Sequence, residues 1–360
     1  MLAFAAHQMG KTVSELNIIP MTDGAGPLND RFERPLRDLR ISVMDRCNFR
    51  CPYCMPEDKY HRDFQFLRSS ERLSFDEITR LAHIFAALGV TKLRITGGEP
   101  LLRPELPDLI GDLDRIEGID DIALTTNGIL LGQQAAALKA AGLDRVTVSM
   151  DAMDQSVFEA MSGGRGSVER VLASIADARE AGLSPLKINA VVKRGINEDA
   201  VLEIVEHFRG TGIIVRFIEY MDVGTINHWQ ASETVPSAEL LDRITSRWPV
   251  EPVDPGYHGE VARRYRFVDG AGELGFISSV SAPFCGSCTR ARLSSDGQLF
   301  TCLFASSGTD LRGPLRAGAS DEELAELIQG IWGRREDRYS ELRAGRQGAE
   351  EKVEMYFIGG

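Results

Sequence analysis

The strongest constraint on the fold is a repeated alternation of short β-like runs with helical segments. Patterns of helical period separate runs rich in β-branched and other apolar residues at 39–44, 91–96, 121–125, 145–150, 187–193 and 214–220. Strands that alternate with helices in this way are typical of βαβ units. Connections between parallel strands of one sheet are right-handed in nearly all proteins. The alternation therefore predicts an α/β fold built on a parallel sheet with right-handed crossovers.

Several helix boundaries are marked in the sequence. Ser74-Phe-Asp-Glu77 has the spacing of a capping box, and Gly89 stands where that helix should end. Gly142 and Gly182 end two later helices by the same logic, because glycine adopts the left-handed conformation without a steric penalty. The expected helices are 74–88, 105–116, 133–141, 167–181 and 199–209.

Polar residues at every second position distinguish these strands from those of an ordinary parallel sheet, which are apolar on both faces. Because side chains alternate across a strand, each set lies on one face. An open doubly wound sheet would bury that face beneath helices, whereas a barrel lumen can surround a polar ligand. We therefore favour a partial six-unit (β/α) barrel over a doubly wound sheet. The polar positions are Arg40, Ser42, Lys92, Arg94, Thr96, Thr147, Ser149, Lys187 and Asn189.

The alternation of predicted strands and helices is confined to the middle of the chain and so divides it into three parts. Residues 1–34 are irregular and are expected to form an N-terminal extension, and residues 35–222 form the barrel. Residues 223–360 form a C-terminal region, with a hairpin predicted at 263–280 and a final helix near 321–332.

Charge and composition narrow the possible partners. The chain has 41 Lys and Arg against 53 Asp and Glu, a net charge of −12, which argues against nucleic acid and anionic membranes as partners. No apolar run is long enough to cross a membrane, and the N-terminus lacks the pattern of a signal peptide. We expect a cytoplasmic protein, in which a polyanionic substrate would need a local basic cleft. Six cysteines in a reducing compartment favour metal ligation over disulfides.

The first cysteine triad, Cys47, Cys51 and Cys54, directly follows the first predicted strand. Three thiolates on one loop suit a 4Fe-4S cluster in which one iron lacks a protein ligand. The alternative is a zinc site completed by a distant histidine. A cluster could use an open coordination position beside a polar lumen, whereas a structural zinc site has no use for one. The pattern therefore favours the cluster.

The second triad, Cys285, Cys288 and Cys302, has its third cysteine farther along the chain. Asp296-Gly297 is a plausible turn that would bring Cys302 back to the first pair. Spacing alone does not separate a three-cysteine zinc site from a second 4Fe-4S cluster.

The C-x₃-C-x₂-C run after the first strand, with Tyr53 before its last cysteine, resembles the radical S-adenosylmethionine superfamily. The resemblance implies that S-adenosylmethionine chelates the open iron and is cleaved to methionine and a 5′-deoxyadenosyl radical. The turn Thr96-Gly-Gly-Glu-Pro100 matches the cofactor-binding turn of that superfamily. Outside this resemblance, Ser149 and Met221 would simply be residues that fill the barrel. The implied cofactor contacts are Tyr53, Gly98, Ser149 and Met221.

A narrower resemblance covers residues 40–360. The stretch Phe284–Phe304, together with 94–103, 124–128 and the final Gly359-Gly360, is similar to the GTP 3′,8-cyclases of molybdenum cofactor biosynthesis. That family implies a second 4Fe-4S cluster whose open iron binds the guanine base of GTP. The sequence contains no phosphate-binding P-loop, so phosphoryl transfer is not expected. The implied GTP contacts are Arg40, Arg94, Thr125, Lys187, Arg290, Ala291 and Arg292.

The family also implies a reaction and its partners. The adenosyl radical removes hydrogen from the 3′ carbon of ribose, and the new radical attacks carbon 8 of guanine. Reduction of the resulting nucleotide radical completes (8S)-3′,8-cyclo-7,8-dihydroguanosine 5′-triphosphate. An external one-electron reductant supplies the cluster, and the product passes to cyclic pyranopterin monophosphate synthase. The enzyme would be a monomer or homodimer. The Gly359-Gly360 tail would enter the active site, although two final glycines are more often a frayed terminus.

Two departures from the family pattern leave every cysteine in place: the long extension 1–34, and Met44 where a threonine is more usual. The extension leaves open an N-terminal partner. Two other functions remain as alternatives. One is a peptide-modifying radical maturase with an auxiliary cluster, which usually has more than three auxiliary cysteines. The other is a non-catalytic iron-sulfur or zinc scaffold, which would give the lumen-facing cations no purpose.

Overall fold

One sheet of twelve strands runs through the computed structural model, which describes residues 27–345 and 351–359. Most of the predicted N-terminal extension, residues 1–26, and the final Gly360 lie outside the described residues. The six predicted strands are present, and they pair in parallel in chain order. They are β1 (Asp38–Ser42), β2 (Lys92–Thr96), β3 (Asp121–Thr126), β4 (Arg145–Ser149), β5 (Leu186–Val192) and β6 (Ile214–Glu219).

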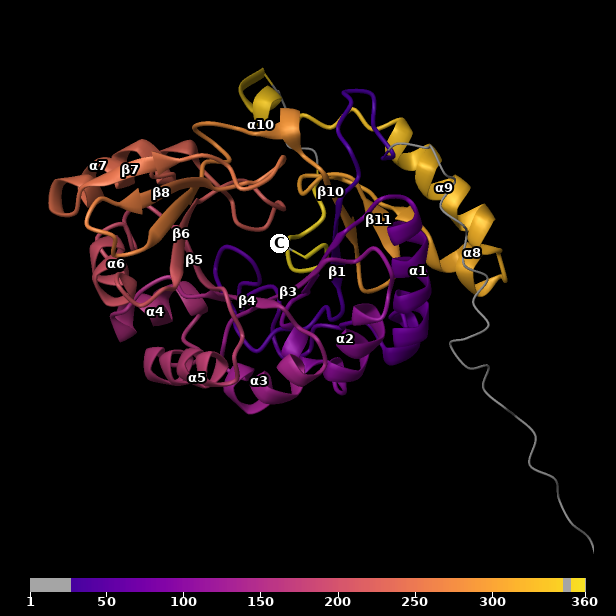
Figure 1. The fold of residues 1–360 in the computed structure, drawn as a ribbon, viewed down its shortest axis with the longest axis horizontal. Coiled ribbons are helices and arrows are strands. Elements are labelled where there is room, and N and C mark those ends of the chain that lie inside the picture. The colour runs from indigo at the N-terminus through magenta and orange to yellow at the C-terminus, as the bar shows by residue number, and fades with distance from the viewer. Residues whose placement is uncertain (1–26, 346–350, 360) are drawn as a thin grey trace, which may run out of the picture.

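Helices cover the outer, convex side of this sheet, and the described end of the chain, in yellow, lies inside its curve (Figure 1). The predicted capping box starts α1, because Ser74 and Glu77 bond each other's backbone N–H groups. Gly89 follows the end of α1 with φ at +100°, as a helix stop requires. The helices between the first six strands are α1 (Phe75–Ala87), α2 (Leu106–Asp114), α3 (Leu131–Ala140), α4 (Gln155–Ser162), α5 (Val168–Glu180) and α6 (Val201–Phe208).

The core lies between the strands and this outer layer of helices. Leu39 and Ile41 of β1 are fully buried beneath the helices, whereas Arg40 between them faces the inside of the curve. Burial of each such aliphatic side chain contributes about 1.5–3 kcal/mol. The alternation read from the sequence therefore separates an apolar outer face from a polar inner face.

The C-terminal region extends this sheet at both edges and does not close it into a barrel. β9 (Glu273–Ile277) pairs in parallel with β6 at one edge, and β10 (Arg290–Leu293) pairs in parallel with β1 at the other. Residues 278–289, which connect β9 to β10, therefore pass from one edge of the open barrel to the other. The remaining strands are antiparallel: β7 (Val250–Val253), β8 (Arg263–Phe267), β11 (Gln298–Phe300) and β12 (Thr309–Asp310).

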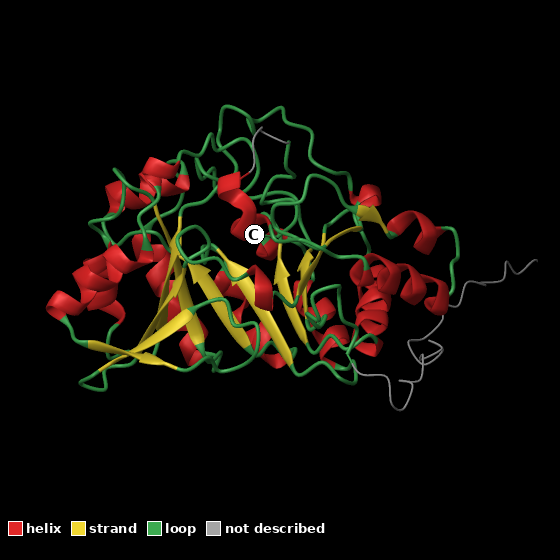
Figure 2. Cartoon of the chain, turned by 90° about the horizontal axis from the view of Figure 1, so that it is seen from above, coloured by secondary structure: helices red, strands yellow, loops and turns green. Residues whose placement is uncertain are grey.

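Both C-terminal sequence predictions are confirmed. The predicted hairpin is β8 and β9, and the predicted final helix is α9 (Asp321–Gly333), which packs against α1. In Figure 2 the loops gather above one end of the strands, where the cysteine loop follows β1. The other α-helices are α7 (Ser237–Arg247), α8 (Arg312–Arg316) and α10 (Tyr339–Leu342). Short 3₁₀ turns occupy Ser69–Glu71, Pro100–Leu102, Ala231–Glu233, Cys285–Ser287 and Arg343–Gly345.

Among the helices that the structure describes, none is long and apolar enough to span a membrane.

Candidate functional site

A cavity of about 340 Å³ occupies the inside of the curved sheet, and all six cysteines line it. The first triad follows β1; in the second triad, Cys285 and Cys288 precede β10 and Cys302 follows β11. All six thiols are free of disulfides. In the described ranges, no group of three or more His, Cys, Asp or Glu side chains is arranged to hold a single metal ion.

The loop that holds Cys47, Cys51 and Cys54 is organised around a buried arginine. The Arg50 guanidinium donates to the carbonyl oxygens of Cys47 at 2.7 Å and of Tyr60 at 2.8 Å. Gly163 lies against this loop, because a Cβ there would be 2.1 Å from the carbonyl oxygen of Arg50. The protein's own hydrogen bonds and packing thus position the backbone of this loop.

The first-triad thiols lie in surroundings that favour their protonated form. Burial raises the pKa of Cys47 to about 12 and raises the pKa of Cys51 and of Cys54 as well. The positive charge of Arg50 opposes this effect at Cys47 but does not outweigh burial. Ligation requires the thiolate, so a bound metal group would have to supply further positive charge.

The Gly97-Gly98 turn packs directly on the backbone of the cysteine loop. Gly98 N–H donates to the carbonyl of Met44 at 2.7 Å, and Glu99 N–H donates to that of Arg46 at 2.8 Å. A Cβ on Gly98 would be 2.4 Å from the carbonyl oxygen of Arg46. Besides forming the turn that resembles a cofactor-binding turn, these glycines thus dock two loops against each other.

Glu99 fastens the same turn to the end of β3. Its carboxylate accepts from Thr126 Oγ1 at 2.7 Å, from Asn127 N–H at 2.8 Å and from Leu101 N–H at 3.0 Å. Burial nevertheless raises its pKa to about 7. Sequence reasoning gave Glu99 no role, although its place within the Gly-Gly-Glu-Pro turn was a signal.

All four predicted S-adenosylmethionine contacts, Tyr53, Gly98, Ser149 and Met221, line the cavity. The Tyr53 hydroxyl donates to Asp151 Oδ2 at 2.8 Å, and Asp151 also accepts from the N–H of Val191. Burial raises the pKa of Asp151 to about 6. Asp151 was missed, although it follows Ser149-Met150 in the motif from which Ser149 was chosen.

The opposite part of the cavity is cationic. Arg292, Arg40 and Arg94 are direct register partners on the adjacent strands β10, β1 and β2, and all three line the cavity. Burial, and then the charges of Arg292 and Arg94, lower the pKa of Arg40 well below its ordinary value. Adjacent like charges on a sheet destabilise it, so this row is suited to an anion.

The remaining predicted substrate contacts divide into two groups. Thr125 and Arg290 line the cavity, and Arg94 Nη1 donates to Thr125 Oγ1 at 3.1 Å. Arg290 Nη1 is buried without a hydrogen-bond partner among the described residues. Lys187 and Ala291 are not among the lining residues. Burial and the nearby Arg216 lower the pKa of Lys187 to about 8.

Four further cations, Lys92, Arg145, Arg216 and Arg335, line the cavity and were not predicted as contacts. Arg216 donates to Asn189 Oδ1 at 2.9 Å, and Arg145 forms a bidentate ion pair with Asp121. The period-two pattern was the available signal for Lys92, which had been placed on the inner face but not selected.

The second triad has an electrostatic environment unlike the first. Burial alone would raise the pKa of Cys288, but the positive charges of Arg290 and Arg335 lower it to about 6. Burial raises the pKa of Cys302 to about 12. The β10 and β11 hairpin turns at Asp296-Gly297, as predicted, so that Cys302 follows a strand paired with that of Arg292.

The described end of the chain lies within the cavity wall. Gly359 has φ at +69°, and a Cβ there would be 2.3 Å from Thr96 Cγ2. Arg292 donates to the carbonyl oxygens of Ile358 and Gly359. Glu354 anchors the segment by accepting from the N–H groups of Thr225 and Ile226.

Comparison with known proteins identifies the family. Residues 41–208 match the family model Radical SAM superfamily, and residues 213–341 match Molybdenum Cofactor Synthesis C. The GTP 3′,8-cyclase of Xanthomonas campestris is 57% identical over 336 residues, which cover 93% of this chain and 98% of that protein. This chain belongs to the GTP 3′,8-cyclase family.

A second member of the GTP 3′,8-cyclase family, from Staphylococcus aureus, is 46% identical over 337 residues, which cover 92% of this chain and 99% of that protein. Among solved structures, Streptococcus suis SuiB bound to S-adenosylmethionine has a TM-score of 0.57 at 16% identity, covering 87% of this chain and 68% of that one. At this identity the likeness shows a shared fold alone.

Proposed function

We propose that this protein cyclises GTP to (8S)-3′,8-cyclo-7,8-dihydroguanosine 5′-triphosphate, the first step of molybdenum cofactor biosynthesis. The names of its relatives support this activity. Within the chain, the observation that carries the proposal is the row formed by Arg292, Arg40 and Arg94 across three adjacent strands. A triphosphate supplies the negative charge that such a row lacks, through charge-assisted hydrogen bonds of about 1.5–3 kcal/mol each.

The first triad fits a 4Fe-4S cluster, because it offers three thiols and leaves the neighbouring cavity open for another ligand. When bound, the cluster and S-adenosylmethionine supply a 5′-deoxyadenosyl radical. The residues proposed to hold that cofactor are Tyr53, Gly98, Ser149 and Met221. Asp151 keeps the Tyr53 ring in place through its hydrogen bond.

We assign a second 4Fe-4S cluster to Cys285, Cys288 and Cys302, with the guanine base of GTP bound beside it. The positive charges of Arg290 and Arg335 at Cys288 suit an anionic thiolate-ligated cluster. The unpartnered Nη1 of Arg290 provides a donor for a substrate acceptor. In this arrangement Thr125, which lines the cavity, completes the site, and the two clusters lie at opposite ends of one cavity. Lys187 and Ala291 are also proposed as GTP contacts, although neither lines the cavity.

The remaining assignments follow from the reaction. The radical barrel is residues 35–222, and the auxiliary region is residues 223–360. An external one-electron reductant must supply the electron, and cyclic pyranopterin monophosphate synthase consumes the product. We place the enzyme in the cytoplasm, because six unpaired cysteines suit a reducing compartment. We also propose that it is a monomer or homodimer.

Isotope transfer tests the proposed reaction directly. Anaerobically reconstituted enzyme, given a reductant, S-adenosylmethionine and GTP deuterated at the 3′ carbon, should form deuterated 5′-deoxyadenosine and a cyclised triphosphate. Cys51→Ala should form neither. The proposal would be wrong if the wild-type enzyme cleaved S-adenosylmethionine at the same rate with and without GTP and transferred no deuterium.

A further inference from the structure

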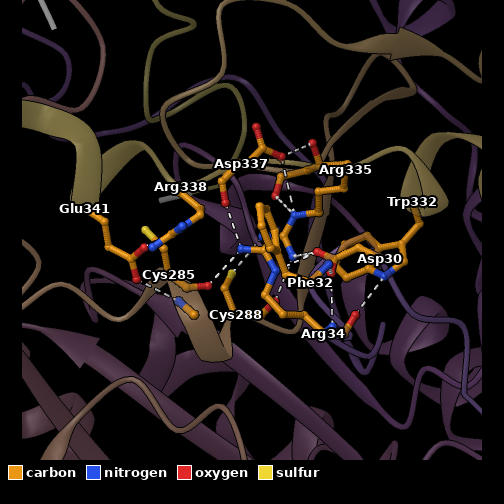
Figure 3. A network of polar contacts seen from close by, with 12 residues as sticks. Asp30, Phe32, Arg34, Cys285, Cys288, Trp332, Arg335, Asp337, Arg338 and Glu341 are labelled. Atoms are coloured by element: carbon orange, nitrogen blue, oxygen red, sulfur yellow. Dashed lines mark hydrogen bonds and ion pairs between the residues drawn. The ribbon is translucent and has the colours of Figure 1, made fainter. Parts of the chain in front are cut away.

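A largely buried network of charged side chains contacts Cys285 and Cys288 of the second triad (Figure 3). It joins Asp30 and Arg34, from the segment before β1, to Arg335 and Asp337, which follow α9. The side chains of Arg34 and Arg335 are each only 1% exposed, and that of Asp30 is 0% exposed. The activity proposed above gives Asp30 and Arg34 no function, and it gives Arg335 only a positive charge near Cys288.

Arg335 contacts both segments that supply the thiols. Its Nη2 donates to Cys288 Sγ at 3.1 Å, and its Nη1 donates to the carbonyl oxygen of Cys288 at 2.8 Å. Its Nε donates to the carbonyl oxygen of Thr301, the residue before Cys302, at 3.1 Å. One planar guanidinium group thus fixes these two segments relative to each other, which the single ammonium of a lysine cannot do.

Neighbouring residues hold Arg335 and extend the arrangement to the third thiol. Asp30 Oδ2 accepts from Arg335 Nη1 at 3.2 Å and from Arg34 Nε at 2.6 Å. Arg34 Nη1 donates to the carbonyl oxygen of Cys285 at 2.8 Å. The Arg335 guanidinium also lies 4.5 Å from the centre of the Trp332 ring. The two arginines therefore bond the backbone at or beside all three cysteines, from the side where Figure 3 shows Asp30 and Trp332.

We propose that Arg335 is a positioning residue for the cluster of the second triad, and that its hydrogen bond to the sulfur of Cys288 raises the reduction potential of that cluster. A donor at a ligating sulfur, carried by a positive charge, stabilises the reduced cluster because that state is the more negative one. A residue that only packed against the loop would change cluster content without changing the potential. The inference rests on the second cluster proposed above.

The test compares Arg335→Gln, Arg335→Lys and the control Arg334→Gln, in which the adjacent, exposed arginine loses the same charge. Each change is made in full-length Cys51→Ala protein, so that only the second triad retains all three of its thiols. After anaerobic reconstitution, iron and sulfide are counted, and the midpoint potential is measured by redox titration followed by electron paramagnetic resonance.

We expect about four irons per chain in the Cys51→Ala parent and the same content and potential in Arg334→Gln. Arg335→Gln should have a lower midpoint potential than the parent. The potential of Arg335→Lys should lie between those two, because lysine keeps the positive charge but lacks the several planar donors of the guanidinium group. If the parent assembles no cluster, the proposed second cluster fails and this inference fails with it. If the parent assembles one and Arg335→Gln has the parent potential, this inference alone fails. Should Arg335→Gln not fold, Arg335→Lys decides, because a parent potential there would overturn the inference.

Discussion

At the scale of single residues, several ionisable groups lie where their usual charge is unfavourable. Burial raises the pKa of Glu99 and of Asp151, and burial together with neighbouring cations lowers the pKa of Arg40 and of Arg292. Such perturbations gather at functional sites. Here the carboxylates lie near the first triad and the arginines near the second, so each end of the cavity has its own electrostatic character.

Glu99 should make the stability of the metal-free protein depend on pH. Its folded pKa of about 7 lies above the unfolded value of about 4.3, so its contribution is fully present below pH ~4 and is lost as the pH rises through ~7. Glu99→Gln removes this titration. The stability gap between parent and variant should therefore shrink by up to about 3 kcal/mol between pH 5 and pH 8. Urea unfolding of the reduced proteins at both pH values measures it, and an unchanged gap would contradict the assignment.

Single substitutions should also separate radical formation from substrate binding. Cys51→Ala removes a proposed ligand of the first cluster and should abolish cleavage of S-adenosylmethionine. Arg290→Ala removes a cation from the far end of the cavity and should leave cleavage without GTP within about two-fold of the parent, while product formation falls at least ~10-fold. Chromatographic measurement of 5′-deoxyadenosine with and without GTP distinguishes the two. Loss of GTP-independent cleavage in Arg290→Ala would refute this separation.

At the scale of elements, the site depends on loops that dock on one another. The sequence predicted the strands and the cysteine loop from local signals, because periodicity and capping involve neighbouring residues. It did not predict that Gly98 packs on Arg46, or that Glu99 bonds Asn127, because these contacts join segments from different βα units. The identity of each motif was thus readable, whereas its supporting contacts required the fold.

Gly98→Ala tests the docking of the turn on the cysteine loop. The added Cβ would be 2.4 Å from the carbonyl oxygen of Arg46, which is backbone and cannot rotate away. With both proposed clusters in the parent, we expect iron content to fall from about eight towards about four per chain as the first cluster is lost. Cleavage of S-adenosylmethionine should fall with it.

Gly333→Ala provides the matched control for Gly98→Ala, because a Cβ there meets no atom within 4 Å and its φ is not positive. It should keep the parent iron content and activity. A Gly98→Ala protein with both clusters and full cleavage would show that the close approach is relieved by a small backbone shift.

At the scale of the whole molecule, the C-terminal region extends the sheet of the first six units at both edges without closing it into a barrel. Local hairpin signals predicted β8 with β9 and the turn between β10 and β11. Local signals could not predict that β9 pairs with β6 or that β10 pairs with β1. In the second of these pairs, the two strands are separated by about 250 residues in the sequence. This topology brings the second triad and the chain end into one cavity with the first triad.

The described end of the chain provides the last prediction, because two opposite outcomes follow from two views of Gly359-Gly360. A terminus without function can be deleted without effect. In the structure, however, Gly359 lies against Thr96 with a left-handed backbone, and Arg292 donates to its carbonyl oxygen. Deleting both glycines should leave cluster content unchanged and GTP binding within a few-fold of the parent. Single-turnover product formation should fall ~10²-fold, which corresponds to about 2.7 kcal/mol of lost transition-state stabilisation.

A paired substitution distinguishes this steric contact from a general effect of the tail. Gly359→Ala places a Cβ 2.3 Å from the Cγ2 methyl group of Thr96, and Thr96→Ser removes only that methyl group. Gly359→Ala alone should lose product formation about as strongly as the deletion. The double variant should recover part of the loss, and the left-handed backbone should keep the recovery incomplete, since alanine disfavours that conformation by about 1 kcal/mol. Equal yields from the parent and from the truncated enzyme would mean that the contact seen between Gly359 and Thr96 has no part in the reaction.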